Sequence, residues 1–521
     1  MTAIVNKITR VIKNISKTSN ITNNKRRFIR AVGEILAFVI VASTYLLTTP
    51  IVVNAGAYAF TENKEVAVDG KNKVTVRALD CEYGNNTYLS VRDIAVAFNG
   101  SAKSFDVAVS DEIKITTGTG YGSVGGENVP WSEEQLDQTS ADAPSMHKIS
   151  LNGDTVKYGA FIRKNSEGKA DAYMSAVDMA MILDVKVSVN EEGCILFDTS
   201  AGFAVDPVSL DAEGFFFGVN SIAVGDATTG EIYFGIDENE VVPIASTSKL
   251  MTYAVVMDAV ANRQISLDDV VTIDKEVEEL AATPDGVIKY KEGDEITVDE
   301  LLKCVLLPSS NESALALAKH VAGSEKNFVG LMNRRAADLG ITDAIFYNCN
   351  GLPVFTGTVA PAKCQNRMSA KDMFVLTRYI FTVHPQITDI TSLKKADIEA
   401  VHMKLDNTNA LLFNMPEVTG LKTGTTTKSG ACLVTSLKMQ GNDGTHDLVV
   451  VVFGAESSID RVRISEIMAR YAKNEFLLKN GLDGAVGADN NSLESISGVV
   501  DAPESPELFI EIMIDRLKRG K

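Results

Sequence analysis

Residues 245–252 read ASTSKLMT, and apolar residues continue a helical pattern toward Val260. A serine at a helix N-terminus lies among free backbone N–H groups, with its hydroxyl accessible, and Ser246 has this position. Lys249 follows one turn later, so its amine returns to the same face. An alcohol is a good nucleophile only when a base takes its proton, and a lysine can do so if burial or a second cation lowers its pKa. The stretch therefore predicts a nucleophile, Ser246, beside its base, Lys249.

Ser309-Ser310-Asn311 is a second polar stretch, and it directly follows Leu306-Leu307-Pro308. The proline marks a break between two predicted helices, where side chains can point into a cleft. We expect Ser309 to pass a proton from Lys249 to a leaving amine. We expect Asn311 to hold a substrate amide and to steady Lys249.

A third polar stretch lies in a strand predicted at 420–425, before two further strands. The predicted substrate-binding residues in this strand are Lys422, Thr423, Gly424 and Thr425. Lys422 would be the second cation that lowers the pKa of Lys249, and either threonine could bind a substrate carboxylate with it. Gly424 permits a close approach of the backbone. The backbone N–H groups of Ser246 and Thr425 are the predicted oxyanion hole.

The elements around these stretches predict an α/β (α+β) fold. Apolar runs separated by turn residues indicate strands at 221–224, 231–234, 432–437 and 448–453. Helices are predicted between them, with N-caps at Thr297 and Ser369. Strands at both ends and helices in the middle indicate an antiparallel sheet flanked by helices, plus a helical subdomain.

In this order, the three stretches resemble the SxxK, SxN and KTG motifs of the penicillin-recognising serine enzymes. Residues 215–480 look like low-molecular-mass penicillin-binding proteins that act as serine D-alanyl-D-alanine carboxypeptidases, and we place this domain at 213–480. Supporting stretches are 245–252, 316–318, 350–352, 369–373 and 420–425. Two features depart from the family. Ser310 stands where glycine is expected, and only a short stretch follows the last predicted helix, in place of a C-terminal β domain.

The resemblance implies a β-lactamase/transpeptidase-like fold and a hydrolysis in two steps. Ser246 would attack the carbonyl between two terminal D-Ala residues of a peptidoglycan stem peptide, expelling the last residue and leaving an acyl-enzyme. Water would then release the trimmed peptide. β-Lactam antibiotics would inhibit the enzyme by acylating Ser246, and no cofactor is implied.

Three alternatives stay open at this point. A class A β-lactamase shares the motifs, but it would need a glutamate on an E-x-x-x-N loop, and residues 346–350 contain none. A non-catalytic, cell-wall-binding envelope protein is a second alternative. An endopeptidase or a transpeptidase is the third, because the shape of the cleft sets the leaving group and the acceptor.

Residues 60–200 form a further predicted domain with an internal repeat. The pattern Y-x-S-x-x-D-x-A occurs at 88–95 and again at 173–180, and a strand-like run follows each copy. Its serine and aspartate predict an N-cap with a capping box, and the Gly/Ser-rich residues 116–126 predict a linker or long loop. The duplicated α+β pattern resembles the copper-amine-oxidase-like N-terminal stalk modules of secreted bacterial envelope proteins. The resemblance implies a spacer or a cell-wall contact, and no copper, because no histidine cluster is present.

The charge distribution points to export. Residues 1–33 carry eight Lys or Arg and no acid, whereas the whole chain has a net charge of −18. An apolar run and an A-x-A site follow, so residues 1–59 are predicted to be a signal peptide or, if uncleaved, a membrane anchor. Both place the body outside the cytoplasm, secreted or membrane-anchored at the bacterial cell envelope. Its acidic character excludes nucleic-acid binding. Residues 481–521 are predicted to be a flexible acidic tail with a short terminal helix.

The six cysteines fit an oxidising or permissive compartment. Cys349 and Cys364 bracket a loop with two prolines and two glycines, which favours a disulfide between them. No cysteine pair has CxxC spacing, and the five histidines form no HExxH motif. The sequence therefore gives no support to a metal site.

Overall fold

The computed structural model describes residues 59–71, 73–81, 86–133, 135, 139–140, 143–164, 169–190, 192–204, 207–208, 216, 218–354, 364–400 and 402–482. The predicted export segment and acidic tail lie outside these residues, except for Ala59, Gly481 and Leu482. From Ala57 onward the chain forms one compact unit. Among the described residues, no helix is both long enough and apolar enough to cross a membrane.

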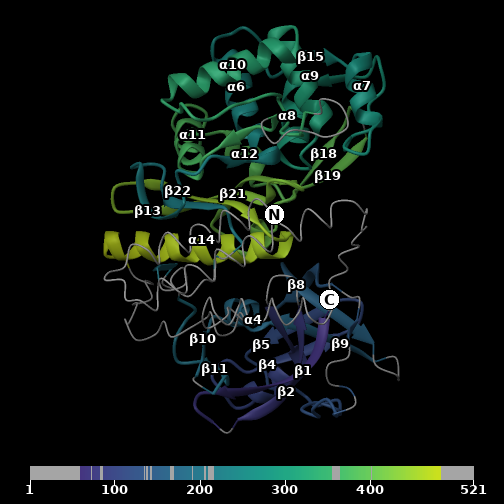
Figure 1. The fold of residues 1–521 in the computed structure, drawn as a ribbon, viewed down its shortest axis with the longest axis vertical. Coiled ribbons are helices and arrows are strands. Elements are labelled where there is room, and N and C mark those ends of the chain that lie inside the picture. Colours follow the sequence, from purple (N-terminus) through teal and green to yellow (C-terminus); the bar gives the residue numbers. More distant parts are fainter. Residues whose placement is uncertain are drawn as a thin grey trace, which may run out of the picture. The chain divides into compact units, whose positions relative to one another are not determined.

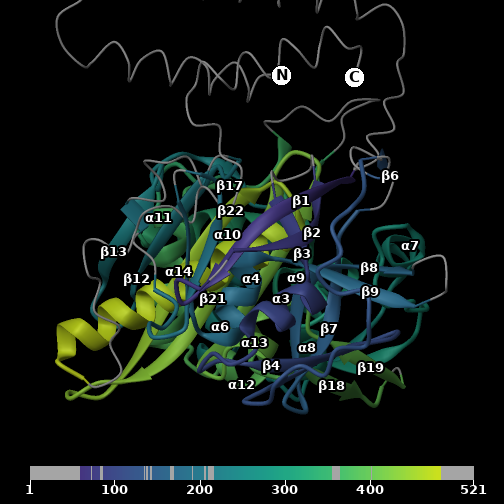
Figure 2. The same ribbon diagram turned by 90° about the horizontal axis from the view of Figure 1, so that it is seen from below.

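The N-terminal region, residues 59–204, is built on an 11-stranded mixed sheet (Figure 1). Its strand order is β10-β11-β1-β2-β3-β9-β8-β7-β5-β4, with β6 paired to β1. The strands are β1 (Ala59–Val68), β2 (Val74–Cys81), β3 (Asn86–Ser90), β4 (Phe105–Val109), β5 (Ile113–Thr117), β6 (Thr139–Ser140), β7 (Ser145–Leu151), β8 (Asp154–Lys164), β9 (Ala170–Ser175), β10 (Lys186–Val189) and β11 (Ile195–Asp198). Two short helices, α3 (Val91–Phe98) and α4 (Ala176–Leu183), pack against this sheet (Figure 2).

The sequence repeat is also a structural repeat. Copy 1 (88–95) ends β3 and begins α3, and copy 2 (173–180) ends β9 and begins α4. The copies pair antiparallel, with Tyr88 opposite Ser175 and Ser90 opposite Tyr173. Both predicted N-caps form, because Ser90 and Ser175 each accept a hydrogen bond from the backbone N–H three residues later. The capping boxes predicted with them were wrong: the two aspartate carboxylates bind arginine side chains instead.

The C-terminal region, residues 218–482, contains a five-stranded antiparallel sheet in the order β13-β12-β22-β21-β20. The strands are β12 (Ser221–Asp226), β13 (Glu231–Ile236), β20 (Val418–Thr426), β21 (Gly430–Gln440) and β22 (Thr445–Ala455). Alternate residues of β22 face opposite cores. Val450 and Val452 share a core with helix α14 (Ser458–Asn480), and Val449 and Val451 share one with the helices before β20. The predicted antiparallel sheet between helical layers is confirmed.

The residues between β13 and β20 form the predicted helical part. Its helices are η1 (Ala245–Ser248), α6 (Lys249–Ala261), α7 (Lys275–Ala282), α8 (Val298–Leu306), α9 (Asn311–Ala322), α10 (Glu325–Asp338), α11 (Ala370–Val383), α12 (Ile387–Thr391) and α13 (Leu411–Asn414). Short strand pairs connect them: β14 (Val242–Pro243) with β17 (Arg367–Met368), β15 (Val270–Thr272) with β16 (Glu295–Thr297), and β18 (Lys395–Ile398) with β19 (Met403–Asp406). The caps predicted at Thr297 and Ser369 are formed, and Thr297 makes a complete capping box with Glu300.

Candidate active site

Ser246 and Lys249 lie at the junction of η1 and α6, as the helix pattern predicts. Ala245 has a positive φ of 47°, a conformation that non-glycine residues rarely adopt and that often marks a functional turn. The Ser246 side chain is half-buried, whereas Lys249 is fully buried. Lys249 Nζ lies 2.9 Å from Ser246 Oγ. An accessible hydroxyl thus faces a base that is hidden from water.

Lys249 is surrounded by neutral acceptors. Its Nζ lies 2.7 Å from Asn311 Oδ1 and 2.7 Å from the carbonyl oxygen of Asn350. Burial lowers the pKa of Lys249 to about 7, so a substantial fraction of the amine is unprotonated near neutral pH. The predicted contact with Asn311 is therefore present. The Asn350 carbonyl was missed, because any residue type offers a backbone oxygen and the Asn-Gly turn at 350–351 was the only sequence signal.

The second motif lies at the start of α9. Asn311 is the first residue of this helix, and its Nδ2 donates to the carbonyl oxygen of Asp285 at 2.8 Å. Ser310 is fully buried and caps the helix by accepting from the backbone N–H of Ser313. Ser309 is half-buried with a positive φ of 71°, and among the described residues its hydroxyl has no hydrogen-bond partner. Its hydroxyl is therefore available for a contact with substrate.

The third motif runs along β20 and packs against the turn that carries Ser246. A Cβ at Gly424 would lie 2.8 Å from the backbone nitrogen of Ser246, so the close approach requires glycine, as predicted. Lys422 is fully buried, and its Nζ donates to the carbonyl oxygen of Thr423 at 3.0 Å. Thr425 is exposed at the end of the motif. The strand thus brings the backbone of the third motif to the nucleophile.

Both lysines of the site are buried, and burial is the largest cause of the lowered pKa of each. Burial is the dominant cause of the low pKa of Lys249, so a second cation is not needed to lower it. Burial and then repulsion by Lys249 hold the pKa of Lys422 well below its ordinary value.

Arg461 is a further cation at this site that the sequence pattern did not reveal. It lies in the first turn of α14, and its NH1 donates to Thr425 Oγ1 at 3.0 Å and approaches the Gly424 carbonyl oxygen at 3.4 Å. Thr408 was also missed; its hydroxyl lies 2.7 Å from that of Thr423. Both reach the strand from distant segments, so no local motif marks them.

The predicted disulfide between Cys349 and Cys364 is not formed, because both cysteines are free. The Sγ of Cys349 instead lies 3.1 Å from Oε1 of Glu325, which also accepts from the Cys349 backbone N–H. Burial and then this carboxylate raise the pKa of the Cys349 thiol well above its usual range. The thiol is therefore a buried, neutral hydrogen-bond donor.

The C-terminal region is similar to known carboxypeptidases. The family model for D-alanyl-D-alanine carboxypeptidase (Peptidase_S11) matches residues 218–457. D-alanyl-D-alanine carboxypeptidase DacD from Escherichia coli is 30% identical over 285 residues, which cover 54% of this chain and 70% of that protein. The chain belongs to the D-alanyl-D-alanine carboxypeptidase family S11.

Two further proteins are similar over shorter segments. The carboxypeptidase DacC from E. coli is 33% identical over 46% of this chain and 57% of its own length. The crystal structure of a peptidoglycan synthesis regulatory factor from Streptococcus pneumoniae is 30% identical, with a TM-score of 0.45 and coverage of 49% of this chain and 74% of that one. The family match begins at residue 218, after the N-terminal sheet.

Family membership favours a D-alanyl-D-alanine peptidase over the β-lactamase and the non-catalytic envelope protein, while D-alanyl-D-alanine endopeptidases from Pseudomonas aeruginosa and E. coli are also similar, each 28% identical over 41% of this chain. The chain is a serine peptidase of family S11, a D-alanyl-D-alanine carboxypeptidase that acts on peptidoglycan. The family acts on the cell wall, outside the cytoplasm.

Proposed function

We propose that Ser246 attacks the carbonyl carbon between two terminal D-Ala residues of a stem peptide. The 2.9 Å distance between Ser246 Oγ and Lys249 Nζ carries this proposal. With a pKa of about 7, Lys249 can take the serine proton as the new C–O bond forms. The tetrahedral intermediate then collapses, and the C–N bond to the last D-Ala breaks. Ser309 relays the proton from Lys249 to the departing amine.

Water completes the cycle. Lys249, again unprotonated, takes a proton from a water molecule that attacks the acyl carbon, and the proton returns to Ser246 as the trimmed peptide leaves. Asn311 keeps Lys249 in place through the 2.7 Å contact and binds the substrate amide. The backbone N–H groups of Ser246 and Thr425 stabilise the oxyanion in both steps.

The terminal carboxylate of the substrate lies along β20, beside Lys422, Thr423 and Thr425. The hydrogen bond from Arg461 to Thr425 supports this placement, because it adds a cation next to the exposed threonine. β-Lactam antibiotics place a carboxylate and a reactive carbonyl in a similar arrangement and are expected to acylate Ser246 as inhibitors.

We further propose that the protein works at the cell envelope, secreted or held at the membrane by residues 1–59. In this proposal the N-terminal region, bounded at 60–200, is a stalk-like spacer that contacts the cell wall, and the catalytic domain spans 213–480. The duplication of α3 and α4 supports a modular origin for this region.

Intact-mass measurement after mixing with benzylpenicillin tests the mechanism. We expect an adduct of one drug molecule that is absent from Ser246→Ala, together with release of D-Ala from a peptide ending in D-Ala-D-Ala. Drug consumption without an adduct would indicate a β-lactamase instead. Untouched drug and peptide would overturn the catalytic proposal.

A further inference from the structure

The two repeat copies use the same aspartate in different ways. In copy 1, Asp93 is fully buried and accepts from Nε (3.0 Å) and NH2 (2.8 Å) of Arg77, which lies on β2 of the same sheet. In copy 2, Asp178 is equally buried and accepts from Nε (2.8 Å) and NH2 (2.9 Å) of Arg463. Arg463 belongs to α14 of the C-terminal region. The aspartate of copy 1 is therefore paired within its own sheet, whereas the aspartate of copy 2 is paired with a helix distant in the sequence.

Strand register shows what copy 2 lacks. Ala78 on β2 lies opposite Leu89 of copy 1, and Ala160 on β8 lies opposite Met174 of copy 2. Leu89 and Met174 occupy the same repeat position, so the residues before the two alanines correspond. They are Arg77 in copy 1 and Gly159 in copy 2. The arginine that serves copy 1 is replaced in copy 2 by a residue without a side chain.

Helix α14 fills the resulting space. A Cβ at Gly159 would lie 2.5 Å from Cγ2 of Ile459, so this glycine is required by the packed helix. Arg463 follows Ile459 by four residues and therefore lies on the same helix face. We call Gly159 and Asp178 the socket. Its two parts receive Ile459 and Arg463, respectively.

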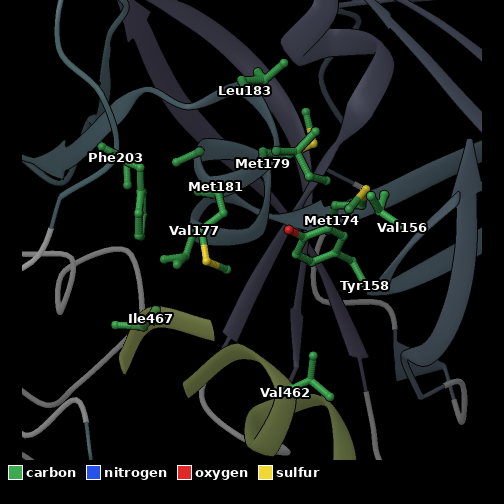
Figure 3. Close-up of a cluster of buried hydrophobic side chains, with 14 of the residues drawn as sticks. Val156, Tyr158, Met174, Val177, Met179, Met181, Leu183, Phe203, Val462 and Ile467 are labelled. Carbon is green, nitrogen blue, oxygen red and sulfur yellow. The ribbon is translucent and has the colours of Figure 1, made fainter. Parts of the chain in front are cut away.

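Further hydrogen bonds join the N-terminal region to α14 and α13 around the socket. The Tyr158 hydroxyl donates to the fully buried Glu466 of α14 at 2.8 Å. Asn414 bonds both the backbone N–H (2.7 Å) and carbonyl oxygen (2.9 Å) of Lys157. Apolar side chains of α4, β8 and α14 surround these groups in a single core (Figure 3). Buried, paired groups of this kind indicate a fixed interface.

The same turn of α14 reaches the active site. Arg461, whose NH1 donates to Thr425, precedes Arg463 by only two residues. Any shift of this turn that breaks the pair with Asp178 would therefore move Arg461 relative to β20. Asp178 lies in the N-terminal region, so this route links that region to the proposed carboxylate site.

We propose that copy 2 has exchanged its own arginine for one supplied by α14, and that Asp178 and Arg463 are positioning residues for binding of the substrate carboxylate. The exchange of arginines is inferred from the strand register and from the hydrogen bonds between Asp178 and Arg463. The effect on binding rests on the function proposed above. Copy 1 cannot receive α14, because Arg77 already occupies the equivalent place.

The first experiment compares Asp178→Asn with the matched variant Asp93→Asn in the full chain. Asp178→Asn should raise KM for a D-Ala-D-Ala peptide about five- to tenfold while kcat changes less than about twofold, since binding and not the serine chemistry is disturbed. A small thioester substrate without a carboxylate should be hydrolysed normally. Asp93→Asn should leave both constants unchanged. Equal effects of the two variants, equal effects on the two substrates, or an unchanged KM in Asp178→Asn would overturn the proposal.

A second variant keeps the inference testable if Asp178→Asn does not fold. Gly159→Arg with Arg463→Ala returns the arginine to the sheet. We expect Asp178 to pair with the new arginine on β8 and α14 to lose its contacts with the N-terminal region. Thermal unfolding should then split into two transitions, one for each region. A single transition like that of the unmodified protein would overturn the exchange. If the unmodified protein hydrolyses neither substrate, the proposed function fails, but the unfolding result still decides the exchange.

Discussion

The active site and the socket each bury a cation, and the difference between them lies in the partners. Lys249 is 0% exposed and Arg463 is 3% exposed. Lys249 contacts a hydroxyl, an amide oxygen and a backbone carbonyl, and burial lowers its pKa to about 7. Burial also opposes the charge of Arg463, but Asp178, with Tyr88 and Asp460, outweighs it and holds the pKa of Arg463 well above its ordinary value. A buried cation without a carboxylate becomes a base, whereas one with a bidentate carboxylate becomes a structural tie.

Replacing Lys249 with a cation that cannot give up its proton should have the largest effect. Lys249→Arg keeps the charge, but a guanidinium stays protonated. We expect it to lose about 10²–10⁴-fold in the rate of acylation by benzylpenicillin, as much as Lys249→Met. Time-resolved intact mass measures both rates, and circular dichroism checks the fold. Near-normal acylation by Lys249→Arg would show that the positive charge, and not the free amine, is what the site needs.

Loss of the ion pair at the socket should lower the free energy of unfolding. Arg463→Met leaves the Asp178 carboxylate buried without its partner, and we expect a loss of about 3–5 kcal/mol in the free energy of unfolding. Adding Asp178→Leu removes the stranded charge and should recover much of that loss. Urea unfolding of the two single variants and the double variant gives the coupling between them. Additive losses would contradict a paired interaction.

The pH dependence of acylation sharpens the contrast from the side of the active site. Because protonated Lys249 cannot act as a base, the rate should fall about tenfold per pH unit below about pH 7. The lowered pKa also means that burial of Lys249 costs stability fully below about pH 7, and that this cost fades as pH rises toward 10.5.

A carboxylate near the base provides the matched variant for this profile. The charge of Glu312 raises the pKa of Lys249, so Glu312→Gln should move the midpoint of the rate profile to lower pH. Stopped-flow measurements of acylation would resolve the profiles of the unmodified protein and of Glu312→Gln. They should cover roughly pH 5–10, the range in which a buried lysine titrates. A rate that still rises between pH 8 and pH 10 would contradict a Lys249 base whose pKa burial has lowered to about 7.

The same contrast explains what could be predicted from sequence. Ser246 and Lys249 are three residues apart on one helix, so a local pattern placed them correctly, and the strand with Gly424 was recognised from its residue types. The acceptor at Asn350 is a backbone oxygen, which residue identity does not mark. Arg461 comes from a helix that follows the motif strand by two further strands, and only tertiary packing brings it close.

Local patterns misled where a distant partner was stronger. The repeat's aspartates look like capping-box residues, but Asp178 binds Arg463, 285 residues away. A charged, bidentate partner outcompetes a single backbone N–H. The disulfide prediction was wrong for a related reason. The composition of the loop between Cys349 and Cys364 does not indicate that the Cys349 thiol donates a hydrogen bond to Glu325.

Ser310 should give the smallest effect, because its buried group is neutral and already has a partner. Glycine was expected at this position, yet the Ser310 φ of −55° does not require it, and the Ser310 side chain caps α9 by accepting from the Ser313 backbone N–H. Glycine is a tolerable cap, so Ser310→Gly should change the free energy of unfolding by only a few tenths of a kcal/mol, and Ser310→Ala by about 1 kcal/mol. Neither should alter the acylation rate, since the hydroxyl faces the helix and not Lys249. A tenfold fall in acylation with either variant would move Ser310 into the proton network and erase its contrast with Ser309.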